Sequence, residues 1–215
     1  MRFPISFPRF GVRRKFVVTG LITAGFVWGL VVVDGAKRQS AALTRVSQTY
    51  GIPHYRPLVP VPSWCIDCFG PDLFARVTSV SYFEWGAYPA HDPVNYRNYT
   101  ALRDLPFLEE IDVFDSAFPV EVLEGMPTLQ RLSIVQNGLR DDDMEIIAHL
   151  HGLRTLTLTT NDITDAGART LSSLQKLTEL DLSGNFVSAE TISELQRSLP
   201  NCQIRNNSSR IANSP

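Results

Sequence analysis

Apolar residues recur at a fixed spacing in the second half of the chain. The pattern L-x-x-L-x-L-x-x-N begins at Leu129, Leu153 and Leu177, positions that lie 24 residues apart, and weaker copies begin at Leu108 and Leu199. Apolar and polar residues alternate within each copy, which predicts a short strand with one buried face. One such unit cannot bury its apolar face alone. We therefore expect the units to stack, with their strands paired in parallel.

Two features flank these strands. An earlier segment, Val77-x-x-Val80-x-Tyr82, matches the start of the pattern and could be a degenerate first strand. The asparagine at the ninth position of each full copy can turn the chain and hydrogen-bond the backbone of adjacent units. The spacing thus predicts a structural ladder, formed by Asn137, Asn161 and Asn185.

Each asparagine is followed by apolar residues three or four positions apart, which predicts a helix in every unit. In the first of these helices, Asp142 and Glu145 fit a capping box, so the run of three aspartates indicates a helix start and not a metal site. Thr164 or Asp165, and then Ser188, occupy the corresponding starts in the next two units.

The strand residues between the buried ones should face outward on one concave surface, which is the candidate ligand-binding face. It has hydroxyl groups at its centre, acidic groups at its edges and a small apolar spot, and it would suit a protein loop or a glycan. Strand propensity alone could also explain the threonines. The predicted residues are Glu110, Asp112, Phe114, Arg131, Ser133, Val135, Thr155, Thr157, Thr159, Glu179, Asp181 and Ser183.

The stretches GLRTLTLTTNDITDAGARTLSSL and KLTELDLSGNFVSAETISELQRSLPNCQI resemble bacterial membrane-anchored leucine-rich-repeat proteins with L-x-x-L-x-L-x-x-N/T-x-I-T-D-A-G units. The lead-in PSWCIDCFGPDLFARV and the closing L-P-x-C-x-I extend the likeness over most of the chain. The resemblance implies a ribonuclease-inhibitor-like horseshoe used for protein recognition, with no catalytic residues. The region from 83 to 105 and the segment FPVEV at 118–122 depart from the repeat.

The N-terminal part of the chain indicates a membrane segment. Residues 16–33, FVVTGLITAGFVWGLVVV, carry no charge and are long enough to cross a bilayer as a helix. Five basic residues lie in the tail 1–15 before it, which favours a cytoplasmic N-terminus and an extracytoplasmic repeat domain. The alternative is a signal peptide whose cleavage would release a secreted protein, although the apolar run is long for that purpose.

The predicted fold class is therefore α/β, a leucine-rich-repeat solenoid with a short parallel sheet and outer helices, preceded by a single transmembrane helix. Residues 34–63 are expected to form a juxtamembrane helix and a proline-rich spacer, and residues 64–105, which are rich in aromatics, an irregular N-terminal cap. The repeats would span 106–205, with a disordered tail at 206–215.

Charge and motifs exclude several functions. Beyond residue 33 the chain has 15 basic and 22 acidic residues, so its net charge is near −7 and nucleic acid is not an expected partner. No phosphate-binding loop, hydrolase motif or metal-binding motif is present, and no cofactor is expected. Cys65 and Cys68 form a C-x-x-C without the context of a redox enzyme or zinc site, which leaves a local disulfide or two free thiols.

These observations favour a membrane-anchored, extracytoplasmic protein that recognises an unknown protein, or a glycan, through its concave face and is not an enzyme. A structural envelope component that self-associates through an exposed edge strand or the aromatic lead-in is the alternative. A thiol-redox protein using Cys65 and Cys68 is the remote one.

Overall fold

The computed structural model describes residues 34–49, 51–57, 75–83, 98–115 and 118–207. Within these ranges the strands form one sheet in the order of the sequence, β1 to β7. Strands β2 to β7 are parallel, whereas β1 pairs with β2 in the antiparallel direction. The strands are β1 (Ile52–Pro57), β2 (Ala75–Phe83), β3 (Glu110–Phe114), β4 (Arg131–Val135), β5 (Thr155–Thr157), β6 (Glu179–Asp181) and β7 (Gln203–Arg205).

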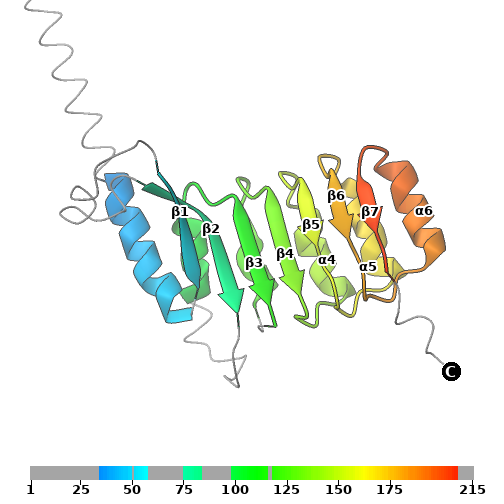
Figure 1. The fold of residues 1–215 in the computed structure, drawn as a ribbon, viewed down its shortest axis with the longest axis horizontal. Coiled ribbons are helices and arrows are strands. Elements are labelled where there is room, and N and C mark those ends of the chain that lie inside the picture. Colours follow the sequence, from blue (N-terminus) through cyan, green and yellow to red (C-terminus); the bar gives the residue numbers. More distant parts are fainter. Residues whose placement is uncertain (1–33, 50, 58–74, 84–97, 116–117, 208–215) are drawn as a thin grey trace, which may run out of the picture.

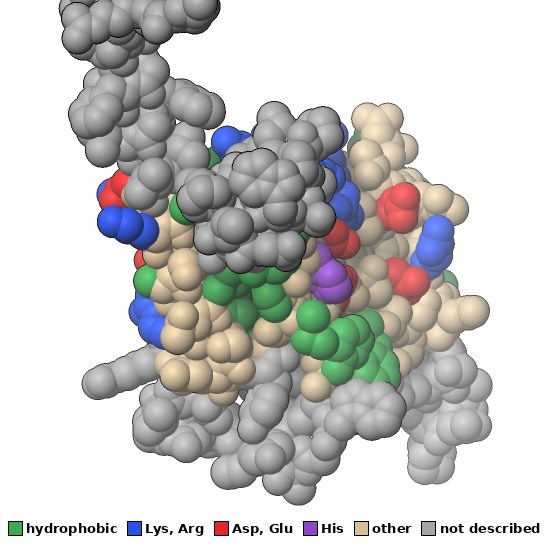
Figure 2. Space-filling view, turned by 60° about the vertical axis from the view of Figure 1, so that its left-hand side comes forward, with side chains coloured by type: hydrophobic (Ala, Val, Ile, Leu, Met, Phe, Trp, Pro, Cys, Tyr) green, Lys and Arg blue, Asp and Glu red, His purple; other side chains and the backbone are tan. Residues whose placement is uncertain are grey.

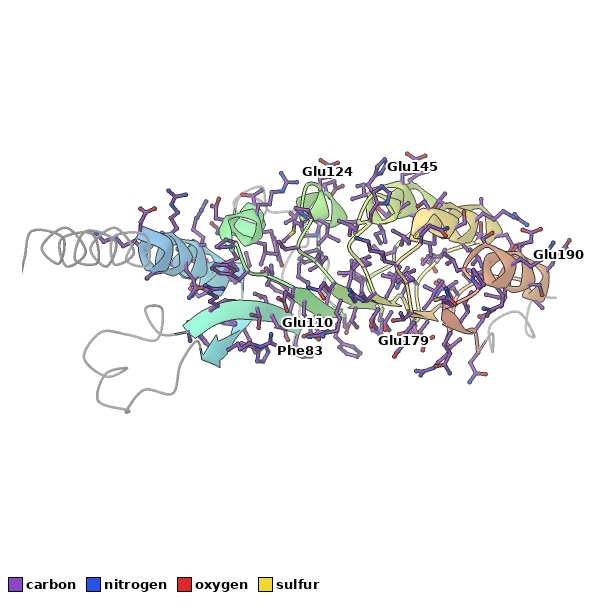
Figure 3. The ribbon with its side chains drawn as sticks, turned by 90° about the horizontal axis from the view of Figure 1, so that it is seen from above. Phe83, Glu110, Glu124, Glu145, Glu179 and Glu190 are labelled. Carbon is purple, nitrogen blue, oxygen red and sulfur yellow. The ribbon has the colours of Figure 1, made fainter. Side chains whose placement is uncertain are left out.

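Helical elements cover one face of this sheet, and no helix of the described ranges lies on the other, which we call the open face, as Figure 1 and the edge-on view of Figure 3 show. A helix over residues 34–46 begins the described chain. The elements that follow are η1 (Ser47–Thr49), η3 (Thr100–Asp104), η4 (Val120–Leu123), α4 (Asp141–Ala148), α5 (Asp165–Thr170), η5 (Leu171–Ser173) and α6 (Ala189–Ser198). The combination of a parallel sheet with one helix layer is the predicted solenoid architecture.

The core lies between the sheet and the helices. Leu132, Leu156 and Leu180 are partners in adjacent strands, and all three are almost fully buried. Ile134, Leu158 and Leu182 are fully buried in the same interior. Each buried leucine or isoleucine contributes about 1.5–3 kcal/mol to folding, so these rows stabilise the stack. The predicted alternation of inward and outward residues is therefore confirmed.

One repeat is shorter than the others. Leu108 and Leu129 are 21 positions apart, whereas the three full copies at Leu129, Leu153 and Leu177 are 24 apart. The three missing residues correspond to almost one helical turn, and the outer element is the four-residue 3-10 turn η4 in place of an α-helix. Pro119 precedes this turn in an extended conformation. The irregularity expected at 118–122 thus lies on the helix side, while β3 keeps its register with β4.

The N-terminal end of the sheet differs from the expected spacer. The prolines from Pro53 onward predict an unpaired linker, but residues 52–57 form β1 against β2. Proline is tolerated there because β1 is the last strand of the sheet on that side, where missing N–H donors leave no ladder hydrogen bond unmade. The sheet therefore extends beyond the predicted start of the repeats at residue 106.

The helix over residues 34–46 covers the first turn of the solenoid. Ala42 and Val46 are fully buried in the core. The Gln39 side chain donates to the carbonyl of Ala75 over 3.1 Å and accepts the backbone N–H of Val77 over 3.1 Å, which fixes the helix to β2. This helix thus covers one end of the solenoid core, and most of the aromatic region 64–105 that was expected to cap it lies outside the described residues.

Two of those aromatics do contribute to the core near this end. Tyr82 and Tyr99 pack with Phe118 in a three-ring cluster, with ring centroids 5.3–5.5 Å apart. Phe83, the next residue after Tyr82, is instead exposed. The predicted degenerate strand at Val77–Tyr82 lies in β2, and Val80 pairs with Ile111 of β3.

The predicted capping box at Asp142 and Glu145 is wrong. The N-cap lies two residues earlier, at Arg140, and the Asp143 carboxylate accepts the backbone N–H of Arg140 over 2.8 Å. Asp141 bonds the next repeat, because its carboxylate accepts both the N–H and the hydroxyl of Thr164.

The other two predicted helix starts can also be assigned. Thr164 and Ser188 are the N-cap residues of α5 and α6, and each accepts a backbone N–H from its own helix.

Several predictions concern residues outside the described ranges. They are the basic tail 1–15, the membrane segment 16–33, the C-x-x-C, most of the cap region and the end of the C-terminal tail. Among the helices of the described residues, none has the length and apolar character that a membrane span requires.

Candidate binding surface

The open face of the sheet carries the predicted surface residues in aligned rows. Register places Glu110, Arg131, Thr155 and Glu179 side by side on β3 to β6, and likewise Asp112, Ser133, Thr157 and Asp181. Phe114 pairs with Val135 at the end of β3 and β4. Figure 3 shows Glu110 and Glu179 projecting away from the helix layer.

Thr159 and Ser183 lie just beyond the ends of β5 and β6. Backbone hydrogen bonds from Gln136 to Thr159 and from Thr160 to Ser183, 3.1 and 2.9 Å long, continue the alignment of neighbouring repeats past the strands. The structure therefore brings the twelve predicted residues onto one face, and it adds residues of β1 and β2 to that face.

An apolar patch occupies the β1 to β4 end of this face. Phe83 is the register partner of Phe114, and the two are 47% and 46% exposed. Ile52 of β1 lies opposite Ser81, two positions from Phe83 on the same face, and is 51% exposed. We call Ile52, Phe83 and Phe114 the apolar patch. Figure 2 shows hydrophobic side chains gathered beside the histidine on this side of the molecule.

Phe83 and Ile52 were not predicted as surface residues. Phe83 follows a strand whose pattern is degenerate, and Ile52 lies in a proline-rich segment that does not alternate. The sequence did contain a signal for Phe83. Side chains alternate between the two faces of a strand, so residues 81 and 83 must face outward if Val80 and Tyr82 face inward.

A chain of polar contacts borders the patch. His54 Nε2 lies 3.0 Å from Ser81 Oγ, and Ser81 donates to Asp112 Oδ2 over 3.4 Å. Burial, followed by the charge of Glu110, raises the pKa of Asp112, while the Ser81 hydrogen bond and the charges of His54 and Arg131 oppose the shift.

This contact chain does not have the order that nucleophilic catalysis requires. In a serine nucleophile site the histidine lies between the serine and the carboxylate, so that it can remove the serine proton. Here Ser81 lies between His54 and Asp112 and is itself almost completely buried. The arrangement binds the side chains to one another and offers no exposed nucleophile.

The remaining charges of the face are unevenly distributed. Arg131 and Glu110 form an ion pair with a distance of 2.6 Å between Nη2 and Oε2. No ion pair joins Asp112, Glu179 or Asp181 to another side chain of the described ranges.

The three asparagines lie at the edge of the solenoid and hold the repeats together. Asn161 and Asn185 are buried, and their side-chain oxygens accept backbone N–H groups from the preceding repeat. Asn137 accepts the N–H of Phe118 over 3.1 Å in the same manner. Their role is structural, and a ligand on the sheet face would not contact the buried pair.

The structure offers no positive sign of metal or thiol chemistry within its described part. No cluster of three histidine, cysteine or acidic side chains is arranged to hold a metal ion there. Cys202 is buried, and burial, with the nearby charge of Glu179, raises the pKa of its thiol and disfavours the thiolate. Cys65 and Cys68 lie outside the described residues.

Comparison with known proteins agrees with this architecture. A family model described as leucine rich repeat matches residues 127–186. The match covers strands β4 to β6 and supports a leucine-rich-repeat architecture in that part of the chain. Comparison with the curated proteins gave no match.

Several solved structures are similar to part of the chain. Internalin C2 from Listeria monocytogenes is 27% identical over 50% of this chain and 45% of its own length, with a TM-score of 0.40. A leucine-rich-repeat protein of Leptospira interrogans is 25% identical over 49% of this chain and 27% of its own, with a TM-score of 0.37. The matched region thus spans less than half the length of either protein.

Proposed function

We propose that this protein is a leucine-rich-repeat recognition module, and not an enzyme, that binds a protein partner through the open face of its sheet. The observation that carries the proposal is the pairing of Phe83 and Phe114, two half-exposed phenylalanine rings in adjacent strands. Large exposed apolar groups rimmed by polar ones are typical of interaction sites. Aromatic side chains also provide much of the binding energy at protein interfaces.

The strands that carry the two phenylalanine rings are held rigidly, which favours binding. β2 and β3 are joined by register over five residue pairs, and β3 and β4 over five more. Because the strands are held between neighbours and backed by the core, little backbone entropy would be lost when a partner docks. A rigid surface of this kind suits recognition better than catalysis, because the serine beside the patch is buried and does not precede a histidine and a carboxylate in the order that a nucleophile needs.

The proposal includes a location. Residues 16–33 would anchor the chain in a membrane with the repeats outside the cytoplasm, because the uncharged run is long enough and the basic residues precede it. A reporter enzyme that folds only outside the cytoplasm, fused after Pro215, should be active. Activity only when the fusion remains in the cytoplasm would contradict this orientation. N-terminal sequencing of the mature protein separates an anchor from a cleaved signal peptide.

Self-association through an edge strand has weaker support. β7 ends the sheet, but it is three residues long and its Gln203 and Arg205 are exposed. Short, charged edge strands oppose strand addition.

The binding proposal can be tested by comparing capture of membrane and envelope proteins by the tagged full chain and two variants. Phe114→Ser removes a ring from the patch, whereas Phe186→Ser removes a ring of similar exposure, 42%, that lies after β6 in another repeat. A partner held by the wild type and by Phe186→Ser but lost with Phe114→Ser supports the proposal. Equal capture by all three proteins, with unchanged unfolding midpoints, would contradict it.

A further inference from the structure

Strands β3 to β6 combine one ring of the apolar patch with an excess of acid, whereas the basic residues His54, Arg56 and Arg76 lie on β1 and β2. On β3 to β6 the outward charged residues are four carboxylates and one arginine, namely Glu110, Asp112, Glu179, Asp181 and Arg131. The arginine is occupied by Glu110 in the 2.6 Å ion pair. Arg205 of β7 is the register partner of Asp181. Asp112 and Glu179 form no ion pair within the described ranges. The charges of His54 and Arg131 act on Asp112 without an ion pair.

Among these carboxylates, Asp112 lies beside the apolar patch. It lies two residues before Phe114 on β3, so the carboxylate and the ring share one face at a separation of about 7 Å along the strand. Its register neighbours on both sides are serines, Ser81 and Ser133, neither of which neutralises it. A carboxylate that is partly removed from water and forms no ion pair gains energy when a cation binds to it directly.

A cation–π contact between an arginine and a phenylalanine already occurs elsewhere in this protein. The Arg76 guanidinium lies over the Phe107 ring, 3.8 Å from its centroid. An arginine that approached Phe114 could stack in this way and reach the adjacent carboxylate with its donors.

We infer that the partner segment bound at this face carries an arginine or lysine beside a large apolar side chain. The apolar side chain packs on Phe83 and Phe114, and the cation bonds Asp112. An acidic segment is rejected, because like charges brought together in an interface are strongly unfavourable. This inference rests on the proposed function and adds the chemistry of the partner to it.

The test uses a phage-displayed library of random peptides selected on the immobilised full-length protein in detergent. Enriched peptides are sequenced and their affinities measured for the wild type, Phe114→Ser, Asp112→Asn and the control Phe186→Ser. We expect arginine or lysine within two positions of an aromatic or aliphatic residue, and about tenfold weaker binding to Phe114→Ser and to Asp112→Asn, with no change for Phe186→Ser. Binding should also weaken as salt is added.

The outcomes separate the two proposals. Peptides that depend on Phe114 but are neutral or acidic, or whose binding is indifferent to Asp112→Asn and to salt, would overturn the basic-partner inference and leave the recognition face standing. Selection that yields no peptide dependent on Phe114 would overturn both. Unfolding midpoints of all variants, measured in parallel, show that any loss of binding arises in a folded protein.

Discussion

The backbone N–H of Asn137 donates to the side-chain Oδ1 of Asn161 over 3.0 Å, although the two residues belong to successive repeats. The same oxygen accepts the N–H of Leu139, and the Asn161 amide donates back to the carbonyls of Ile134 and Leu158. A further bond, to the carbonyl of Thr159 over 3.3 Å, brings the backbone groups that this one side chain bonds to five, three in its donor role and two in its acceptor role. Asn185 repeats the arrangement one unit later.

Asn161→Ala should therefore be among the most destabilising polar substitutions in the chain. Each backbone group left buried without a partner costs about 1–3 kcal/mol, and we expect the free energy of unfolding to fall by at least about 3 kcal/mol. Urea unfolding followed by circular dichroism measures the loss.

Two further variants control this prediction. Asn137 is half-exposed, and within the described ranges its side chain makes two hydrogen bonds, both to Phe118, so Asn137→Ala should lose about 1 kcal/mol. Lys176→Ala, at an exposed site, should change little. Equal losses for Asn161→Ala and Asn137→Ala would show that the ladder does not carry the stability assigned to it.

A second prediction concerns the residue before each ladder asparagine, which has positive φ in three successive repeats. The φ angles are 54° at Gln136, 57° at Thr160 and 75° at Gly184. Threonine is strained in this conformation because it is β-branched, whereas glycine is not. Thr160→Gly should stabilise the fold by up to about 1 kcal/mol, since the relief of strain outweighs the greater flexibility of the unfolded chain.

The reciprocal change at the next repeat should have the opposite sign. A Cβ at Gly184 would lie 3.0 Å from Thr160 Oγ1 and 3.2 Å from Thr160 Cα, in addition to the strain of positive φ. Gly184→Thr should lower the free energy of unfolding by at least about 1–2 kcal/mol. Thermal unfolding of both variants gives the comparison, and a loss of stability in both would contradict the strain argument.

Tyr82 provides the third prediction. Its ring is fully buried, and its hydroxyl makes no hydrogen bond of good geometry among the described residues, although the Thr49 side chain interacts with it. Tyr82→Phe removes a poorly paired polar group and keeps the ring, so stability should be unchanged or rise by up to about 1 kcal/mol. Tyr82→Ala should lose about 3–5 kcal/mol, because it leaves a cavity beside Tyr99 and Phe118. A large loss in Tyr82→Phe would reveal a partner for the hydroxyl.

The strand register could be predicted from the sequence because three copies of one pattern repeat at a constant period. Once Leu132, Leu156 and Leu180 are taken as inward, parity fixes the outward residues Ser133, Thr157 and Asp181 without further information. The position of the candidate surface follows from the same parity.

The N-terminal end could not be predicted in this way, because its structure depends on long-range contacts. β1 contains Pro53 and Pro57 and has no apolar alternation, so only its pairing with β2 makes it a strand. Gln39 gives no sequence signal of the two hydrogen bonds that fix its helix to β2. Phe83, the ring that completes the apolar patch, was missed because the segment after it departs from the repeat.

The last prediction uses two aspartates whose pKa values shift in opposite directions. Burial and then Glu110 raise the pKa of Asp112. At Asp165 burial also acts upward, but hydrogen bonds from the Ser188 backbone, Thr191 and the Ser188 hydroxyl, with the charge of Arg169, outweigh it, so the pKa is lowered. The Ser188 N–H lies 2.8 Å from Asp165 Oδ1.

These directions give opposite effects on stability. A raised carboxyl pKa means that the folded state disfavours the charge, so Asp112→Asn should stabilise the protein at neutral pH, and the gain should disappear as the pH falls below the ordinary aspartate pKa. A lowered pKa means that the folded state favours the charge. Asp165→Asn should therefore destabilise the protein at neutral pH, and its loss should fade as the pH falls through the lowered pKa of Asp165. Solvent screening limits both effects to less than about 1 kcal/mol. Urea midpoints of wild type and both variants from neutral to acidic pH test the signs, and parallel curves for the two variants would contradict the assignment.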